Sequence, residues 1–314
     1  MALAQRRTPP EPASLSPSRP FTPLLLLAVL APLFALLSPY NPLSSLSQHS
    51  NPFESFPLAE SNALSDTPKA LIVTAHPDDE VMFFSPTIWS LNKAGWEVSG
   101  LCLSTGNSSG LGAMRTDELY KSYEVLGVER KRIGIIDHPD LQDSMTAEWD
   151  PALILSIVEK HLSTSPADVV ITFDERGISN HPNHIAISEA LSSSTRSTQN
   201  SLSSIKVLHL RSPAILPKFT GPLYPIYLQV HSTVLDILNS NRYAGTDDTN
   251  DSKRSAGHSG GRHDGSRSVI VISNPSEWLT GIRAMMAHES QLVWFRWLYI
   301  SFSRLMWVNE LLEI

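Results

Sequence analysis

Short apolar segments that alternate with helical patterns limit the fold of this chain more strongly than any other feature. Helical spacing is found at Ser85–Gly95 and Ala147–Leu162, and an apolar segment lies on each side of both. The apolar segments are 70–75, 96–104, 132–137, 167–174, 205–210 and 269–273. Apolar strands that alternate with helices are typical of a parallel sheet covered on both faces. The sequence therefore predicts an α/β fold with a mostly parallel sheet and helices on both faces.

Polar clusters follow four of the predicted strands, each at the point where the strand ends. They are "HPDDE" (76–80), "STGNSSG" (104–110), "DHPDLQD" (137–143) and "DERGISNHPNH" (174–184). In open parallel sheets, ligands bind beyond the carboxyl ends of the strands. We therefore expect the functional site at this edge of the sheet.

The first of these clusters places a histidine and three acids between apolar segments, where uncompensated charge is costly. A divalent cation would compensate it, and His76 with Asp79 offers two ligands on one tight turn. Catalytic zinc sites commonly use three protein ligands and leave one position open. His181 and His184 follow another strand, and either could supply the third ligand.

Composition excludes several classes of protein. The net charge of −7 argues against a nucleic-acid partner. The single cysteine, Cys102, excludes an intrachain disulfide and a cysteine-rich zinc module. "GNSSGLG" is not the dinucleotide-binding pattern G-x-G-x-x-G, and no phosphate-binding G-x-x-x-x-G-K-[ST] occurs.

The chain divides into four parts. We expect a disordered N-terminus at 1–20, a membrane-spanning or signal-anchor segment at 21–40, a linker at 41–68 and one domain at 69–314. A cleaved signal peptide is the alternative interpretation of the apolar segment. The polar tract at about 241–268 is predicted to be a disordered insertion in the domain.

"AHPDDE" together with the distal "HPNH" resembles the LmbE-type, PIG-L family of zinc-dependent deacetylases. Leu101–Leu119 is similar to a further conserved loop and helix of that family, so the resemblance extends over 70–311, interrupted by the insertion. His288–Leu311 resembles the eukaryotic branch, which acts on N-acetylglucosaminyl-phosphatidylinositol in GPI-anchor biosynthesis. The resemblance implies a Rossmann-like fold and a metal-dependent amidohydrolase.

Residue by residue, the resemblance makes His76, Asp79 and His184 the ligands of Zn²⁺ or another divalent metal. It makes Asp78 the general base and gives His181 the task of stabilising the oxyanion or protonating the leaving amine. These roles agree with what hydrolysis of an amide requires, namely an activated water and an acid for the leaving nitrogen.

Four further residues are candidates for substrate binding. Arg115 could bind the phosphate of the substrate, although a salt bridge to Glu118 is the alternative. Asn107 and Ser108 could bind sugar hydroxyls or shape a turn. His288 could reach the site from the last third of the chain, or pack on a helix face.

The predicted partners are the glycolipid substrate and a membrane. Trp and Phe residues interleaved with arginines in 294–307 suit a helix at a headgroup boundary, or equally a packed core helix.

The resemblance implies a single-pass protein of the endoplasmic reticulum membrane with a cytosolic catalytic domain, whereas Arg6, Arg7 and Arg19 favour a lumenal one. A glycosylation acceptor at Asn107 favours the cytosol, because a glycan there would obstruct the site. The alternative functions are deacetylation of another N-acetyl amino sugar and a non-catalytic membrane-tethered role.

Overall fold

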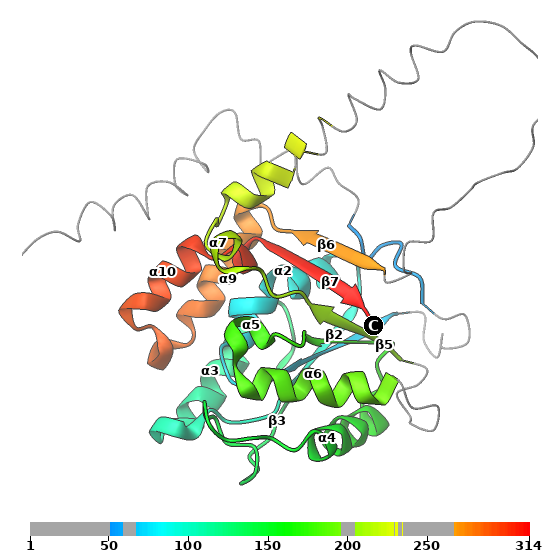
Figure 1. Cartoon of the computed structure of the whole chain (residues 1–314), viewed down its shortest axis with the longest axis vertical. Helices are drawn as coiled ribbons and strands as arrows, with labels where there is room; N and C mark the ends of the chain where they lie inside the picture. Colours follow the sequence, from blue (N-terminus) through cyan, green and yellow to red (C-terminus); the bar gives the residue numbers. More distant parts are fainter. Residues whose placement is uncertain (1–50, 59–66, 196–204, 229, 232–233, 235–266) are drawn as a thin grey trace, which may run out of the picture.

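A seven-stranded sheet forms the centre of the described chain. The structure is a computed structural model that describes residues 51–58, 67–195, 205–228, 230–231, 234 and 267–314 (Figure 1). The strands are β1 Lys69–Thr74, β2 Glu97–Cys102, β3 Ile133–Ile135, β4 Val169–Phe173, β5 Lys206–Leu210, β6 Ser268–Ile272 and β7 Val308–Glu313. Their order across the sheet is β3-β2-β1-β4-β5-β7-β6. The pairs among β1 to β5 are parallel, and β7 pairs antiparallel with β5 and β6.

The strand order reverses between β1 and β4. The chain leaves β1 for β2 on one side, and β4 leads to β5 on the other. A crevice opens at such a point because the two following loops diverge. In β4 all five residues are buried, and in β1 only the first is not, which explains their unbroken apolar sequences.

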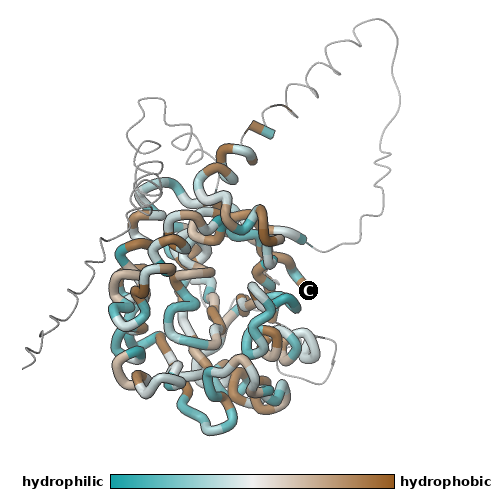
Figure 2. Tube along the Cα trace, turned by 60° about the vertical axis from the view of Figure 1, so that its left-hand side comes forward, coloured by the Kyte–Doolittle hydropathy of each residue, from teal (hydrophilic) through white to brown (hydrophobic). Residues whose placement is uncertain are grey.

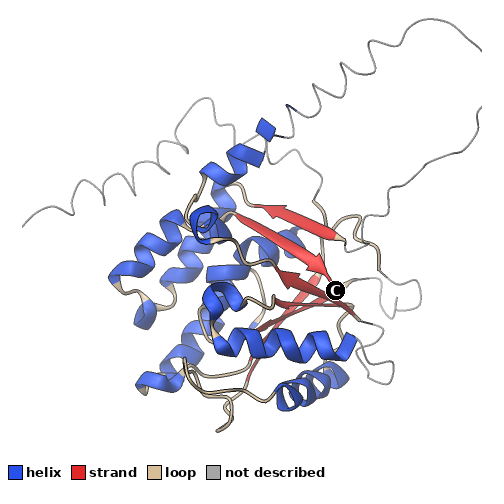
Figure 3. Cartoon of the chain, in the orientation of Figure 1, coloured by secondary structure: helices blue, strands red, loops and turns tan. Residues whose placement is uncertain are grey.

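Helices cover both faces of the sheet (Figure 3). The helices are α2 Asp79–Lys93, α3 Gly112–Val125, α4 Pro151–Thr164, α5 Gly177–Asn180, α6 Pro182–Thr195, α7 Ile215–Lys218, α9 Pro275–Met286 and α10 Trp294–Phe302. On one face α9 packs against α2 and α3, and on the other α4 packs against α6. Short 3₁₀ turns are η2 Asn107–Ser109, η3 Arg130–Arg132, η5 Glu289–Gln291 and η6 Arg304–Met306.

The helix boundaries differ from the predicted ones for local reasons. α2 begins at Asp79 instead of Ser85, because Asp79 and Glu80 occupy its first turn, where the helix dipole favours acids. α4 begins at Pro151 instead of Ala147, because the Asp150 side chain accepts a hydrogen bond from the Ala152 N–H and caps the helix. α2 lies between the sheet and α9, so it is buried on nearly all sides.

Two features differ from the sequence interpretation more strongly. The end of the chain, which was expected only to contribute an aromatic helix, also forms β7 between β5 and β6. Part of the expected linker is packed into the domain, since Phe53 and Phe56 are buried and lie edge-on against Trp96. Hydrophobic stretches run through the interior of the trace, as Figure 2 shows.

Within the described residues, no helix has both the length and the apolar character needed to cross a bilayer. The predicted N-terminal segments 1–20 and 21–40 lie outside the described residues, as does most of the predicted insertion at 241–268.

Candidate active site

The loops that follow β1 and β4 meet at the point where the strand order reverses. His76, Asp78 and Asp79 lie on the turn between β1 and α2, and His181 and His184 lie at the start of α6. All five side chains line one cavity of about 960 Å³. The predicted convergence of the two motifs is therefore present in the fold.

The Asp79 carboxylate is held as an anion at the base of the cavity. Its Oδ2 accepts hydrogen bonds from the backbone N–H groups of Ala75 (3.0 Å) and His76 (2.8 Å). Burial alone would raise the pKa of Asp79, but the neighbouring His184 and His76 rings and these hydrogen bonds hold it well below its usual range. A buried carboxylate of this kind is suited to a cation.

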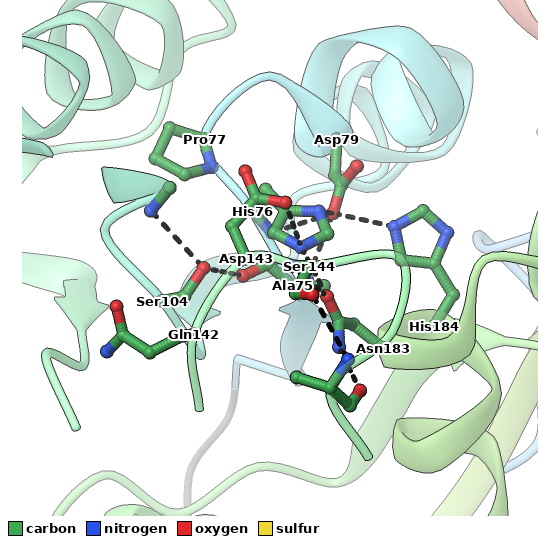
Figure 4. A network of polar contacts seen from close by, with 12 residues as sticks. Ala75, His76, Pro77, Asp79, Ser104, Gln142, Asp143, Ser144, Asn183 and His184 are labelled. Carbon is green, nitrogen blue, oxygen red and sulfur yellow. Dashed lines mark hydrogen bonds and ion pairs between the residues drawn. The ribbon is translucent and has the colours of Figure 1, made fainter. Parts of the chain in front are cut away.

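The two histidine rings beside Asp79 have their tautomers set by hydrogen bonds on the far side. Figure 4 shows both rings together with Asp79 and Asn183. His184 Nδ1 donates to the Gly177 carbonyl at 2.9 Å, which leaves its Nε2 buried, without a hydrogen-bond partner, 3.3 Å from Asp79 Oδ2. His76 Nε2 donates to Asn183 Oδ1 at 3.0 Å, which leaves Nδ1 facing Asp79 Oδ2 at 3.7 Å. Partners of this kind orient metal-binding histidines.

These three side chains could hold a divalent cation. One ligand atom from each of His76, Asp79 and His184 lies within 4.8 Å of the others, and all three residues are buried. A second set, His76, Asp143 and His181, meets the same distance criterion but is only partly buried. The first set fits better, because His76 Nε2 is already bound to Asn183 and only Nδ1 is free. The unpartnered Nε2 of His184 is the orphaned polar atom that a metal would satisfy.

His181 lies beside the three residues His76, Asp79 and His184, called the triad below, but is not one of them. Its ring lies 4.8 Å from the His76 ring and 4.7 Å from the His184 ring. Burial and repulsion by these two histidines lower the pKa of His181 to about 4. The residues before it, Gly177 to Asn180, all have positive φ, so a strained turn presents this ring to the cavity.

Asp78 points away from the triad. It is 3% exposed, and its Oδ2 lies 2.8 Å from Arg296 Nη2, with Arg115 Nη2 3.8 Å from Oδ1. Burial raises the pKa of Asp78, although Arg296 opposes the shift. Glu80 fixes the turn by accepting the Asp78 backbone N–H at 3.0 Å. The two adjacent aspartates thus face different surroundings.

Arg115 is bonded to the protein itself and also lines the cavity, so its predicted salt bridge to Glu118 is wrong, while its predicted contact with a phosphate stays a prediction. Its guanidinium donates to the carbonyls of Gly106 (2.8 Å) and Pro77 (2.7 Å) and to Asp143 (3.2 Å). Glu118 accepts instead from Ser290, at 2.7 Å and 2.6 Å. Arg115 therefore joins three loops of the site. Gly106 has φ +63°, and a Cβ there would lie 2.5 Å from this guanidinium, so the approach requires glycine.

The other predicted substrate-binding residues divide into two groups. Ser108 lines the cavity, but Asn107 and His288 are not among its described lining residues. The Asn107 side chain instead accepts the Gly112 N–H at 2.8 Å at the start of α3. His288 is fully buried and lies 2.6 Å from Glu80 Oε1. Burial alone would lower the pKa of His288, but the carboxylates of Glu80, Asp78 and Glu118 together outweigh it and raise that pKa. The expected contact of His288 with substrate is therefore replaced by support for the turn at Asp78.

Sequence reasoning missed several residues of the site. Asn183 lies inside the "HPNH" motif, so a signal for it was present, and it is fully buried. Asp143 was not missed, because it ends the polar cluster 137–143 and was expected to support the site; it lies 3.4 Å from His76 Nε2. Arg296 and Lys218 also line the cavity, and no local pattern connects them with residues 76–79.

Comparisons with known proteins agree over most of the chain. Residues 71–194 match the family model described as PIG-L, GlcNAc-PI de-N-acetylase. N-acetylglucosaminyl-phosphatidylinositol de-N-acetylase of Bos taurus is 33% identical over 244 residues, covering 77% of this chain and 82% of the bovine protein. A probable enzyme of the same name from Dictyostelium discoideum is 35% identical over 279 residues, covering 81% of this chain and 96% of its own. Among solved structures, N,N'-diacetylchitobiose deacetylase from Pyrococcus horikoshii aligns with a TM-score of 0.38 at 20% identity, covering 54% of this chain and 69% of that chain.

Proposed function

The chain belongs to the PIG-L family of N-acetylglucosaminyl-phosphatidylinositol de-N-acetylases, and from this premise we propose that it hydrolyses the acetamide of that glycolipid. The products are glucosaminyl-phosphatidylinositol and acetate, in GPI-anchor biosynthesis. The observation that carries the proposal is the buried His76–Asp79–His184 group at one end of a cavity that Asp78 and His181 also line.

His76, Asp79 and His184 would hold Zn²⁺ or a comparable divalent ion. Two neutral imidazoles and one carboxylate are a donor set that zinc accepts in catalytic sites. The ion would supply a Lewis acid for the acetyl carbonyl and would lower the pKa of a bound water to about 7. Asn183 and the Gly177 carbonyl hold the two imidazoles in the orientation this requires.

Asp78 is the proposed general base. Its carboxylate lines the cavity, and Arg296 favours its ionised form. The water loses a proton to Asp78 as its oxygen bonds to the acetyl carbon, and the carbon–nitrogen bond then breaks as the amine gains a proton. His181 lines the same cavity as Asp78 and, once protonated, would hydrogen-bond the acetyl oxygen or deliver the proton to the leaving nitrogen.

Arg296 and Lys218 are the proposed ligands of the phosphodiester. Arg115 was the candidate from sequence; it lines the cavity too, but its guanidinium already donates to two carbonyls and to Asp143. Arg296 and Lys218 line the same cavity and belong to α10 and α7. The Nε of each arginine is buried without a hydrogen-bond partner, but the Arg296 side chain is the more accessible one, at 22% exposed against 8% for Arg115. A planar fork suits a phosphate oxygen pair.

A deacetylase of another N-acetyl amino sugar is the second candidate. Phe219, Phe295 and Phe302 line the cavity and favour a substrate with a lipid portion over a free sugar.

The proposed location is the endoplasmic reticulum membrane, with a single span at 21–40 and a cytosolic catalytic domain. Support for the cytosol comes from Asn107, since a glycan on its amide nitrogen would lie next to Ser108, which lines the cavity.

The deciding experiment incubates the purified full chain with N-acetylglucosaminyl-phosphatidylinositol and measures released acetate. We expect release that a chelator abolishes and zinc restores, and no comparable release from N,N'-diacetylchitobiose. Equal release from both substrates would favour the second candidate, and release unaffected by the chelator would contradict the metal assignment. Asn250, in the sequence "NDS", is a second glycosylation acceptor. Endoglycosidase treatment of wild-type and Asn250→Gln protein therefore tests the orientation, because a mobility shift lost in the variant would place the domain in the lumen.

A further inference from the structure

An unusually apolar helix forms one side of the cavity mouth. In α10 only Ile300 is fully buried, although the helix sequence is "WFRWLYISF". Trp294 is 74% exposed, Phe295 51% and Trp297 42%. A soluble surface rarely keeps so many large apolar side chains together in water. α10 therefore has an outer face that nothing in the described chain covers.

The opposite side of the mouth is also apolar. In and after α7, the exposed residues include Leu216 at 84%, Phe219 at 51% and Leu223 at 67%. The stretch 223–228 projects from the body of the molecule and carries hydrophobic segments (Figures 1 and 2). Leu216 and its neighbours thus present a second apolar face.

The two faces belong to one surface. Gly221 packs against the backbone of Ser301 and Phe302 at the end of α10, and the Arg304 guanidinium lies 3.6 Å from the centre of the Tyr224 ring. Phe219 and Phe295 line the cavity as well. We call this the mouth surface; its exposed members are Ile215, Leu216, Phe219, Leu223, Tyr227, Val293, Trp294, Phe295, Trp297 and Leu298.

Two cations adjoin the mouth surface. Lys218 and Arg296 line the cavity next to Phe219 and Phe295, and residues 211–228 and 290–308 contain no aspartate or glutamate. Arg296 is paired with Asp78 inside the cavity, and the other two cations of these ranges, Arg211 and Arg304, are paired with Glu310. Tryptophan and tyrosine beside basic residues are the composition preferred at the headgroup level of a bilayer.

We infer that the mouth surface docks on the lipid bilayer, so that a glycolipid enters the cavity sideways while its acyl chains stay in the membrane. The identity of the glycolipid rests on the proposed function, whereas the contact between the mouth surface and the bilayer does not. A bilayer is the occupant that accounts for the apolar rim, the cations behind it and the continuity of the rim with the cavity. A second protein would explain only the first of these.

Fluorescence quenching tests the contact directly. The chain has seven tryptophans, and none lies in residues 1–50, so a membrane segment there contributes no signal. In vesicles whose acyl chains are brominated near the headgroup, we expect the full chain to lose the emission of Trp294 and Trp297. The loss should disappear in a Trp294→Phe/Trp297→Phe variant and persist in Trp89→Phe, a matched change on α2. Equal emission in brominated and ordinary vesicles, or a loss that the double variant retains, would overturn the inference.

Kinetics separate docking from catalysis. A Trp294→Glu/Leu216→Glu variant changes two exposed residues that do not line the cavity. We expect its KM for glycolipid in vesicles to rise at least tenfold, with unchanged release of acetate from the deacylated, water-soluble headgroup. A parallel loss on both substrates would contradict docking. If neither substrate is turned over, the proposed function fails while the quenching result still decides the docking. If quenching is absent and the protein forms a dimer whose amount depends on concentration, the mouth surface is an interface with a second copy, and the proposed contact with the bilayer is refuted.

Discussion

At the scale of single residues, Asp78 and Asp79 show how two adjacent carboxylates receive different tasks. Asp79 accepts two backbone N–H groups and faces the two histidines, whereas Asp78 faces Arg296 and the cavity. We expect Asp79→Asn to lose the metal. Asp78→Asn should retain it and lose turnover by about 10²–10⁴-fold, because the amide keeps the shape but accepts no proton. Metal content per chain, measured together with kcat, checks the expectation for each variant. An Asp78→Asn protein that is free of metal would show that Asp78 is a ligand or a residue needed for folding.

Arg296 makes a second test at this scale. Arg296→Gln removes a cation from the cavity, so we expect KM for the phosphodiester substrate to rise about tenfold, in line with a charge-assisted hydrogen bond of ~1.5 kcal/mol or more. The control is Arg283→Gln, which removes an exposed cation of α9. A substrate without the phosphate should be affected much less by the Arg296 change. The same rise for both substrates would show that Arg296 acts only through Asp78.

His209 gives the fold a dependence on pH. This ring is buried in β5, and burial lowers its pKa to about 4. The unfolded chain binds a proton near pH 6.5, so the stability from neutral His209 is present above that pH and is lost as the pH falls toward 4. Between pH 7.5 and pH 5 the loss is about 2 kcal/mol.

Urea unfolding at the two pH values measures this loss. In His209→Gln the decrease in the free energy of unfolding should shrink by that amount, whereas His231→Gln, at an exposed position, should behave as wild type. An identical pH dependence in all three proteins would exclude His209 as its source.

The residues that could be predicted from sequence are those that lie within a local motif. His76, Asp79 and His184 were selected from two short segments, and the fold brings them together; their roles stay predictions. His288 was given a possible substrate contact because its burial beside Glu80 depends on packing that sequence does not reveal. Arg296 could not be linked to Asp78, which lies 218 positions earlier, because only the folded chain brings them together.

At the scale of elements, five strands of the parallel part were foreseen because apolar segments with β-branched residues mark buried strands. β7 was not, because its sequence "VNELLE" contains polar residues and follows an aromatic helix. The strand is fixed by Asn309, whose side chain accepts from the Thr87 hydroxyl at 2.7 Å and donates to the Phe83 carbonyl at 2.9 Å. These bonds tie β7 to α2.

Removing that tie should destabilise the domain. Asn309→Ala leaves buried partners on α2 unpaired, so we expect a loss of about 2–3 kcal/mol in the free energy of unfolding. Chemical denaturation measures it, with the exposed Ser156→Ala on α4 as a control expected to stay within about 0.5 kcal/mol of wild type. A change of that small size at Asn309 would show that β7 is held by its strand pairing alone.

At the scale of the whole molecule, the site joins segments from the beginning, middle and end of the domain. The loop after β1 and the loop after β4 supply the metal-binding group, and α10 supplies Arg296. The alternation of strands and helices predicts the first two at one edge of a sheet, because parallel strands end on the same side. The chain returns α10 to that edge by way of β6 and α9, and neither element carries a sequence motif that predicts this path.

The place of β7 inside the sheet also governs the order in which the sheet can be completed during synthesis. Val308–Glu313 follow β5 and β6 in the chain, yet they pair with β5 on one side and with β6 on the other, and the N–H of Ile314 bonds to the Val207 carbonyl. Until this strand has been synthesised, β5 keeps an open edge and β6 lacks its neighbour in the sheet. A nascent chain that has not reached Val308 therefore carries two unpaired strand edges, which is the kind of surface that favours association with other chains.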